Sequence, residues 1–171
     1  AFADAAIPIG HGQFMLKPAI EGRILQALAP VRGERVLEVG TGTGFFAACL
    51  AELGGIVESI EIHADLAAMA RRAIDEQGIA RVTVEAGDAM QRDAGGRYEV
   101  VALTGSMPVY DPRFEPRLAL GGRLFVVVGT PPVMQARLIT RTGEQAWLTE
   151  ALFETCIEPL LHAIEAPRFR F

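Results

Sequence analysis

The sequence predicts an α/β fold in which a doubly wound, mostly parallel sheet of seven strands carries helices on both faces. Short apolar segments alternate with amphipathic segments between residues 36 and 129, and this alternation is typical of parallel strands joined by right-handed crossovers. A glycine-rich turn joins the first of these strands to the helix after it. Two further segments, 134–141 and 147–157, flank a turn and predict a C-terminal antiparallel hairpin.

The composition fits one globular domain. Of the 171 residues, 50% are hydrophobic and 22% are charged, which excludes a disordered chain. The net charge of −5 argues against a nucleic-acid partner, and no apolar run is long enough to span a membrane. No signal peptide is visible, so we expect a cytoplasmic protein with Cys49 and Cys156 as buried free thiols in regular elements. The three histidines lack the spacing of metal ligands, so we expect no metal.

The segment before the sheet combines a loop with a helix. Residues 1–8 are small, apolar and irregular, and residues 9–13 predict a glycine-rich loop. Pro18 suits the first turn of a helix, where its missing N–H costs nothing. Apolar residues follow at helical spacing up to Leu28, and Pro30 ends the helix.

The glycine turn follows a buried strand. The apolar, β-branched segment 36–39 predicts that strand, and 45–53 predicts the helix after the turn. Gly40, Gly42 and Gly44 let the backbone approach a ligand closely, and the helix N-terminus offers free N–H groups. The third glycine comes one residue too early for the G-x-G-x-x-G pattern of dinucleotide-binding folds. A tight turn without any ligand remains the alternative.

Acidic residues follow the next two strands. The strand 56–61 ends in Glu61, roughly 20 residues after the first glycine, where a carboxylate can accept two hydrogen bonds from a ribose diol. A solvated acid at a strand end is the alternative for this residue. A helix at 63–77 then leads to a strand at 82–86, which Asp88 follows closely.

The rest of the parallel sheet repeats this pattern. A strand is predicted at 98–104, and the turn 105–108 after it could line a pocket. A short helix at 113–120 and a strand at 123–129 complete the alternation. Ligands bind outside the carboxyl ends of the strands in such sheets. We therefore expect the glycine turn, the two acids and the turn after the fourth strand to meet in one site.

These motifs together resemble the class I S-adenosylmethionine-dependent methyltransferases, which have a Rossmann-like fold. Within that class the chain resembles the protein-L-isoaspartate O-methyltransferase family over nearly its whole length. The segments that carry the resemblance are 8–13, 35–44, 121–124 and 158–160. Family members usually carry a further helical segment before the first of these, so we expect the chain to be a fragment.

The resemblance implies a single methyltransferase domain over residues 1–171. Residues 1–35 would form the acceptor loop and the lead-in helix, 36–129 the cofactor-binding core, and 130–171 the C-terminal hairpin and tail. The implied cofactor is S-adenosyl-L-methionine. The implied methyl acceptor is the α-carboxylate of isoaspartyl residues in damaged proteins or peptides.

The resemblance also implies roles for individual residues. The glycine turn would wrap the methionine part of the cofactor, Glu61 would hold the ribose, and Ile62 would pack on the adenine. Asp88 would meet the adenine edge, although an acidic residue in an ordinary Gly-Asp turn is the alternative. The implied cofactor-binding residues are Glu38, Gly40, Thr41, Gly42, Thr43, Gly44, Glu61, Ile62, Asp88, Ala89 and Thr104. The implied substrate-binding residues are His11, Gly12, Gln13, Leu16 and Met107.

The acceptor loop departs from the family pattern. The family continues this loop as Thr-Ile-Ser, with the serine at the substrate site, whereas this chain has Phe14, Met15 and Leu16. Met107 stands where the family commonly has a small residue, and Cys156 replaces a basic residue. No catalytic side chain can be named with certainty, because the serine position is occupied by leucine.

Three readings of the function follow. The first is an isoaspartyl methyltransferase with a modified loop, whose acceptor carboxylate is ionised at neutral pH and needs no general base. The second is a divergent methyltransferase that acts on a more apolar acceptor, and the third is a cofactor-binding module without turnover. A nicotinamide-dependent dehydrogenase is disfavoured by the glycine spacing and Asp88. The true acceptor, the oligomeric state and the pathway stay open.

Overall fold

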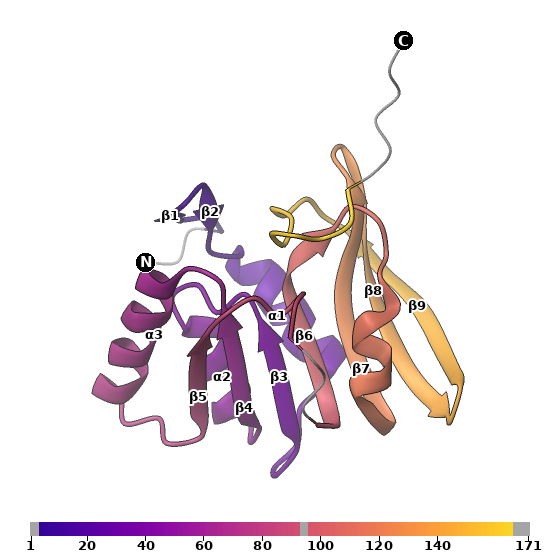
Figure 1. Ribbon diagram of the computed structural model, residues 1–171, viewed down its shortest axis with the longest axis horizontal. Helices are drawn as coiled ribbons and strands as arrows, with labels where there is room; N and C mark the ends of the chain where they lie inside the picture. The colour runs from indigo at the N-terminus through magenta and orange to yellow at the C-terminus, as the bar shows by residue number, and fades with distance from the viewer. Residues whose placement is uncertain (1–3, 93–95, 166–171) are drawn as a thin grey trace.

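The computed structural model describes residues 4–92 and 96–165. A seven-stranded sheet forms its centre, with the strand order β5-β4-β3-β6-β7-β8-β9 (Figure 1). The elements, in chain order, are β1 (Pro8–Gly10), β2 (Gln13–Phe14), α1 (Pro18–Leu28), β3 (Arg35–Val39), α2 (Phe45–Glu52), β4 (Ile56–Glu61), α3 (Ala64–Glu76), β5 (Val82–Ala86), β6 (Tyr98–Met107), the 3-10 helix η1 (Pro112–Arg117), β7 (Leu118–Thr130), β8 (Val133–Gly143) and β9 (Ala146–Glu154).

The predicted fold class is confirmed. Strands β5, β4, β3, β6 and β7 are paired in parallel, and β7, β8 and β9 are paired antiparallel, which gives the expected C-terminal hairpin. Parallel strands are buried on both faces, so they are apolar at consecutive positions rather than at alternate ones. In β3, Val36 packs with α1 and α2, whereas Leu37 packs on the opposite face with Phe114 of η1.

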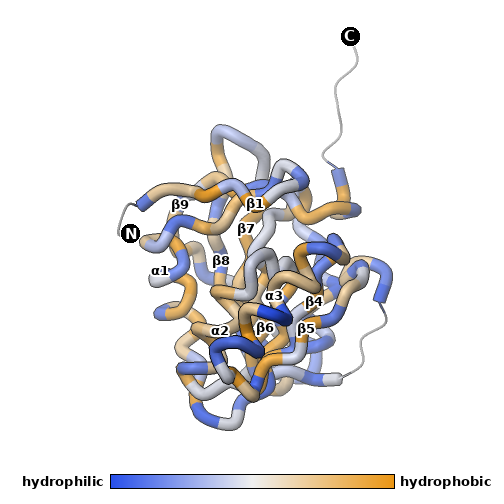
Figure 2. The backbone as a smooth tube through the Cα atoms, turned by 90° about the vertical axis from the view of Figure 1, so that its left-hand side faces the viewer, coloured by the Kyte–Doolittle hydropathy of each residue, from blue (hydrophilic) through white to orange (hydrophobic). Residues whose placement is uncertain are grey.

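Small residues let α3 pack closely on the glycine turn. Gly44 has φ +84°, and a Cβ there would lie 3.1 Å from both Ala70 Cβ and Ile74 Cδ1. The third glycine of the motif therefore serves helix packing. In Figure 2 the hydrophilic segments lie mostly in the outer turns, as a core on both faces of the sheet requires. No helix in the described part of the chain is long and apolar enough to cross a membrane.

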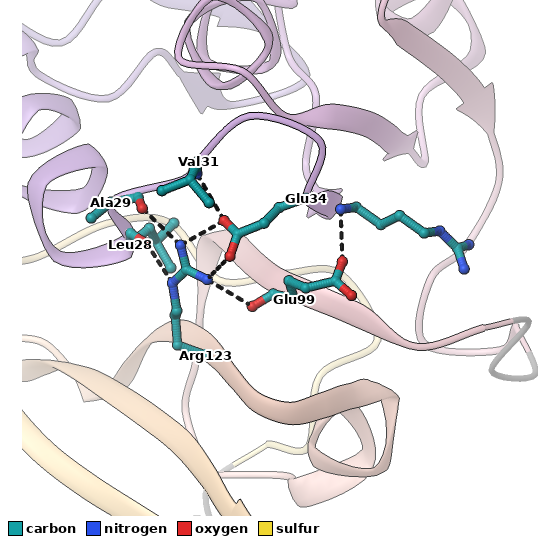
Figure 3. Close-up of polar contacts among 7 residues, drawn as sticks. Leu28, Ala29, Val31, Glu34, Glu99 and Arg123 are labelled. Carbon is teal, nitrogen blue, oxygen red and sulfur yellow. Dashed lines mark hydrogen bonds and ion pairs between the residues drawn. The ribbon is translucent and has the colours of Figure 1, made fainter.

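An arginine fixes the end of α1 to the sheet (Figure 3). Arg123 of β7 forms a two-pronged ion pair with Glu34, with Nη1–Oε1 at 2.6 Å and Nη2–Oε2 at 2.8 Å. Its Nε and Nη2 also donate to the carbonyl oxygens of Leu28 and Ala29, which end the helix. The helix is thereby held at a fixed place relative to the central strands.

Four local expectations are wrong. Residues 9–13 belong to the small hairpin β1–β2 rather than to a plain loop. The helix expected at 113–120 is η1, and it ends at Arg117 because Leu118 pairs with Tyr98 and starts β7. Cys156 is exposed beyond the end of β9, and Cys49 is half-buried, although both are free thiols as expected.

The fourth concerns the turn expected at 105–108. Instead, β6 continues to Met107. Ser106 N–H donates to Glu158 O, and Leu160 N–H donates to Ser106 O, both at 2.9 Å. The C-terminal segment thus supplies backbone partners that keep this part of the chain extended.

Candidate functional site

A cavity lies at the carboxyl ends of β3, β4, β5 and β6. Figure 1 shows the β1–β2 hairpin and the C-terminal segment on opposite sides of these strand ends. Eleven of the residues that the sequence singled out line the cavity: Gln13, Leu16, Gly40, Thr41, Gly42, Thr43, Glu61, Ile62, Asp88, Ala89 and Thr104. The expected meeting of these segments at one sheet edge is therefore what the structure has.

The glycine turn packs closely against the end of β6. Gly40 has φ +98°, and a Cβ there would lie 2.4 Å from Thr104 Oγ1. The Thr104 hydroxyl lies 2.6 Å from Gly40 O and 2.9 Å from Val39 O, so it links the end of β6 to the turn. Only glycine satisfies both the left-handed backbone and this close approach.

Glu61 is the best-held acid of the cavity. Its side chain is 4% exposed, Oε2 accepts the Gly42 N–H at 2.8 Å, and Oε1 accepts the His63 N–H at 3.0 Å. A carboxylate has about four acceptor sites, so the two backbone bonds orient it and leave capacity for two further donors. An adjacent pair of hydroxyl groups is the ligand chemistry that this arrangement suits.

Glu38 is fully buried behind the turn and reaches the cavity wall indirectly. The Ser59 hydroxyl donates to Glu38 Oε2 at 2.5 Å and lies 2.5 Å from the hydroxyl of Thr41, which lines the cavity. Burial raises the pKa of Glu38 to about 8, against the smaller opposing effect of the Ser59 hydrogen bond. At neutral pH this residue is therefore mainly a neutral acid that positions Thr41.

Asp88 is tied to the C-terminal segment. Oδ1 accepts the Met90 N–H at 2.8 Å, and Oδ2 lies 2.7 Å from His162 Nδ1. Pro159, Leu160 and Leu161 of the same segment line the cavity. The end of the described chain therefore forms one wall of the site.

A second cavity adjoins the first on the side of residues 13–16. It has a volume of about 440 Å³ and includes Cys156 and Glu158 in its lining. Leu16 and Thr104 line both cavities, together with residues 13–15. The altered loop thus forms the boundary between the two spaces.

Several expected site residues lie elsewhere. Met107 is fully buried in the core on the η1 face, because β6 extends through it. His11 turns outward, where its Nε2 lies 2.9 Å from Asp65 Oδ2 and its ring stacks on His63 with centroids 3.9 Å apart. Gly12 and Gly44 are likewise outside the lining of either cavity.

Sequence reasoning missed Glu21. This residue of α1 is 6% exposed and lines the first cavity. Glu21, Ile24 and Leu28 are spaced three and four apart, so they share one helix face. An acid within an apolar stripe is the signal that could have found it.

The charges of the first cavity suit a cationic ligand. Glu21, Glu61 and Asp88 line it, whereas no lysine or arginine of the described residues does. A ligand with a positive centre and a ribose fits this acidic lining. A dinucleotide pyrophosphate would bring negative charge toward acids with no cation to pair with it.

Comparison with known proteins identifies the family. A sequence model of the family described as Protein-L-isoaspartate(D-aspartate) O-methyltransferase (PCMT) matches residues 1–161. The chain belongs to this family. Its resemblance to the family, first drawn from the glycine turn and the flanking motifs, is confirmed.

Three curated relatives carry the name protein-L-isoaspartate O-methyltransferase. The protein from Koribacter versatilis is 38% identical over 82% of this chain, that from Rhodopseudomonas palustris 36% over 94%, and that from Anaeromyxobacter dehalogenans 37% over 95%. This chain spans 64%, 66% and 79% of their respective lengths.

Solved structures support the same fold. A Plasmodium falciparum protein described as a protein-L-isoaspartate O-methyltransferase, crystallised with S-adenosyl-L-homocysteine, has a TM-score of 0.80 and 20% identity over 92% of this chain and 80% of its own. A second protein-L-isoaspartate O-methyltransferase has a TM-score of 0.81 and 22% identity over 92% of this chain and 52% of its own. At these identities the likeness concerns the fold alone.

Proposed function

We propose that the chain binds S-adenosyl-L-methionine and methylates the α-carboxylate of isoaspartyl residues in damaged proteins or peptides. The observation that carries this proposal is the acid-lined cavity beside the glycine turn in a member of this family. The cofactor has a positive sulfonium, a ribose diol and an adenine. The lining offers acids for the sulfonium, the Glu61 carboxylate for the ribose diol and the apolar Ile62 for the adenine.

The binding roles follow from the lining residues. Glu61, already oriented by two backbone N–H groups, would accept hydrogen bonds from both ribose hydroxyls. Ile62 would pack on the adenine, with Asp88 and Ala89 at its edge. The turn from Gly40 to Thr43 would enclose the methionine part, and Glu38 would support Thr41 from behind.

The chemistry requires positioning rather than proton transfer. When bound, S-adenosylmethionine supplies a methyl group on a positive sulfur. An acceptor carboxylate oxygen forms a bond to that carbon while the carbon–sulfur bond breaks, and the bonding pair stays on sulfur. An α-carboxyl group has a pKa of about 3.3–3.7, so it is already the nucleophile at neutral pH. The chain's task is to align the two reactants and exclude water.

A more apolar acceptor is the second candidate function. Phe14, Met15 and Leu16 line both cavities and offer a carboxylate no side-chain hydroxyl. A small apolar molecule with a nucleophilic oxygen or nitrogen would suit this wall. A cofactor-binding module without turnover would also bind the cofactor but transfer no methyl group.

We also propose that the chain acts as one catalytic domain in the cytoplasm. Two free thiols, one of them exposed at Cys156, support a reducing compartment. The expected protein substrate, in which isoaspartyl residues form by damage, is consistent with that setting. Its recognition surface would include the second cavity.

The test is a methyl-transfer assay with two matched peptides. One peptide contains a single L-isoaspartyl residue, and the other has aspartate at the same place. Base-labile methyl ester is expected on the isoaspartyl peptide alone. Cofactor binding without ester on either peptide would contradict the proposed acceptor and favour the apolar alternative or the non-catalytic module.

A further inference from the structure

Glu21 is an acid of the first cavity whose carboxyl group has no partner among the described residues. It lies in the first turn of α1, immediately after the acceptor loop, and its side chain points into the buried face shared with Ile24 and Leu28. It lines the first cavity together with Leu16. The residue therefore shares the first cavity with the altered loop and the glycine turn.

The carboxyl group of Glu21 has no partner among the described residues. No side-chain hydrogen bond or ion pair joins it to them, and the residue as a whole is 6% exposed and lines the first cavity. The titratable groups that interact with it are Glu38 of β3 and Cys49 of α2, and neither can carry a positive charge. Burial raises the pKa of Glu21 to about 7. A carboxyl group in a cavity lining that has no protein partner is free to form a hydrogen bond with a ligand.

We propose that Glu21, as a neutral carboxylic acid, donates a hydrogen bond to the acceptor carboxylate and so replaces the hydroxyl that Leu16 lacks. This inference rests on the proposed function. One acceptor oxygen is held by the Glu21 O–H, and the other forms the bond to the methyl carbon. Glu21 keeps its proton throughout, so charge balances between the carboxylate and the sulfonium.

Charge decides which form of Glu21 can do this. An ionised Glu21 would repel an incoming carboxylate in a cavity that already contains Glu61 and Asp88. The acid form offers one donor and no charge. A nearby acceptor carboxylate also favours the proton on Glu21, because two carboxylates at close range cannot both ionise easily. Acceptor binding and protonation therefore reinforce each other.

The experiment measures kcat/KM for the isoaspartyl peptide between about pH 5.5 and 9, with S-adenosylhomocysteine affinity measured alongside. For the wild type we expect kcat/KM to fall about tenfold per pH unit above neutrality, as one essential proton is lost. Glu21→Gln keeps a donor that does not titrate, so its profile should be flat and its activity at pH 7 within about threefold of wild type. Glu76→Gln, on the exposed face of α3, is the matched control and should behave as wild type.

A second pair of variants separates the role from folding. Glu21→Leu should raise KM for the peptide about tenfold or more, the cost of leaving a polar partner unmet, while the Kd of S-adenosylhomocysteine stays within about twofold. Adding Leu16→Ser to Glu21→Leu should restore part of the lost peptide affinity. If Glu21 served only the packing of α1, adding Leu16→Ser would not restore peptide affinity.

Three results would overturn the proposal. Weaker S-adenosylhomocysteine binding in Glu21→Gln with an unchanged peptide KM would assign Glu21 to the cofactor's amino group. Activity that rises with pH and disappears in Glu21→Gln would make it a general base. If no methyl transfer is detected, the peptide is instead titrated calorimetrically into the complex of the chain with S-adenosylhomocysteine. Peptide binding with the expected pH dependence would then support Glu21 and reject the proposed reaction, whereas no binding would reject both.

Discussion

Glu61 combines two functions in one carboxylate, because it orders the turn through Gly42 N–H and has capacity left for a ligand. Glu61→Gln keeps the size of the side chain but replaces one acceptor oxygen with a donor. We expect S-adenosylhomocysteine binding to weaken by about 1–3 kcal/mol, the usual value of hydrogen bonds to a charged group. Calorimetric titration checks this, with Glu76→Gln as control. Unchanged affinity would remove Glu61 from the ribose site.

Glu38 links the site to the pH dependence of folding. Its pKa is raised from the ordinary 4.5 to about 8 in the folded chain. The folded state therefore holds a proton that the unfolded state has released, and stability falls as pH rises from about 4.5 to about 8. Glu21 contributes in the same direction, with its pKa raised to about 7.

Glu38→Gln isolates the larger of these effects. An amide cannot ionise, so the fall in the free energy of unfolding between pH 5 and pH 8.5 should shrink by about 2–4 kcal/mol. Urea denaturation at both pH values measures it. The same pH dependence in variant and wild type would show that Glu38 is not the titrating group.

Sequence reasoning succeeds for residues at the ends of the parallel strands. Glu61 and Asp88 could be placed from the sequence, because the ends of parallel strands meet at one edge. Met107 and His11 could not, because their environment depends on contacts with distant parts of the chain. Met107 is buried by an extension of β6, and His11 is drawn outward by Asp65 on α3.

At the scale of elements, the sequence predicts the order of helices and strands and the bounds of the first parallel strands, but not those of β6, η1 and β7. Hydrophobic periodicity and glycine placement are local signals, so the bounds of α1 and β4 come out correctly. The extension of β6 depends on Glu158 and Leu160, more than 50 residues further along the chain. Such partners leave no local pattern at Ser106.

Arg123 tests how elements are held together. Its ion pair with Glu34 is mostly buried, with side chains 16% and 17% exposed, and it also binds the last carbonyls of α1. Arg123→Ala should lower the free energy of unfolding by about 2–4 kcal/mol, because Glu34 would remain without its partner. Arg123→Lys should recover less than half of this, since lysine cannot form the two-pronged pair.

Denaturant unfolding measures both Arg123 variants, and Arg72→Ala on the exposed side of α3 is the control. The Arg123 guanidinium holds the pKa of Glu34 below its ordinary value. The stabilisation should therefore be present at neutral pH and be lost as the pH falls below about 4.5. A loss under about 0.5 kcal/mol in Arg123→Ala would mean that α1 is anchored by its apolar face alone.

At the scale of the whole molecule, the cavity is built from segments that span nearly the entire described chain. The acceptor loop, α1, the glycine turn, the ends of three further strands and the C-terminal segment all contribute. Sequence reasoning could bring together the glycine turn, Glu61 and Asp88, because they follow the ends of parallel strands. The other side depends on how a hairpin, a helix and a tail pack together, so the second cavity could not be predicted, and the only local signal for Glu21 is an acid within the apolar face of α1.

The central claim is that this acidic cavity binds a cationic nucleoside. The most direct measurement is calorimetric titration of the chain with S-adenosylmethionine, S-adenosylhomocysteine and NAD in separate experiments. We expect saturable one-to-one binding of the first two and no measurable heat from NAD, because Glu61 and Asp88 would face its pyrophosphate with no lysine or arginine in the described lining. Binding of NAD in preference to S-adenosylmethionine, or binding of neither sulfur compound, would contradict the account.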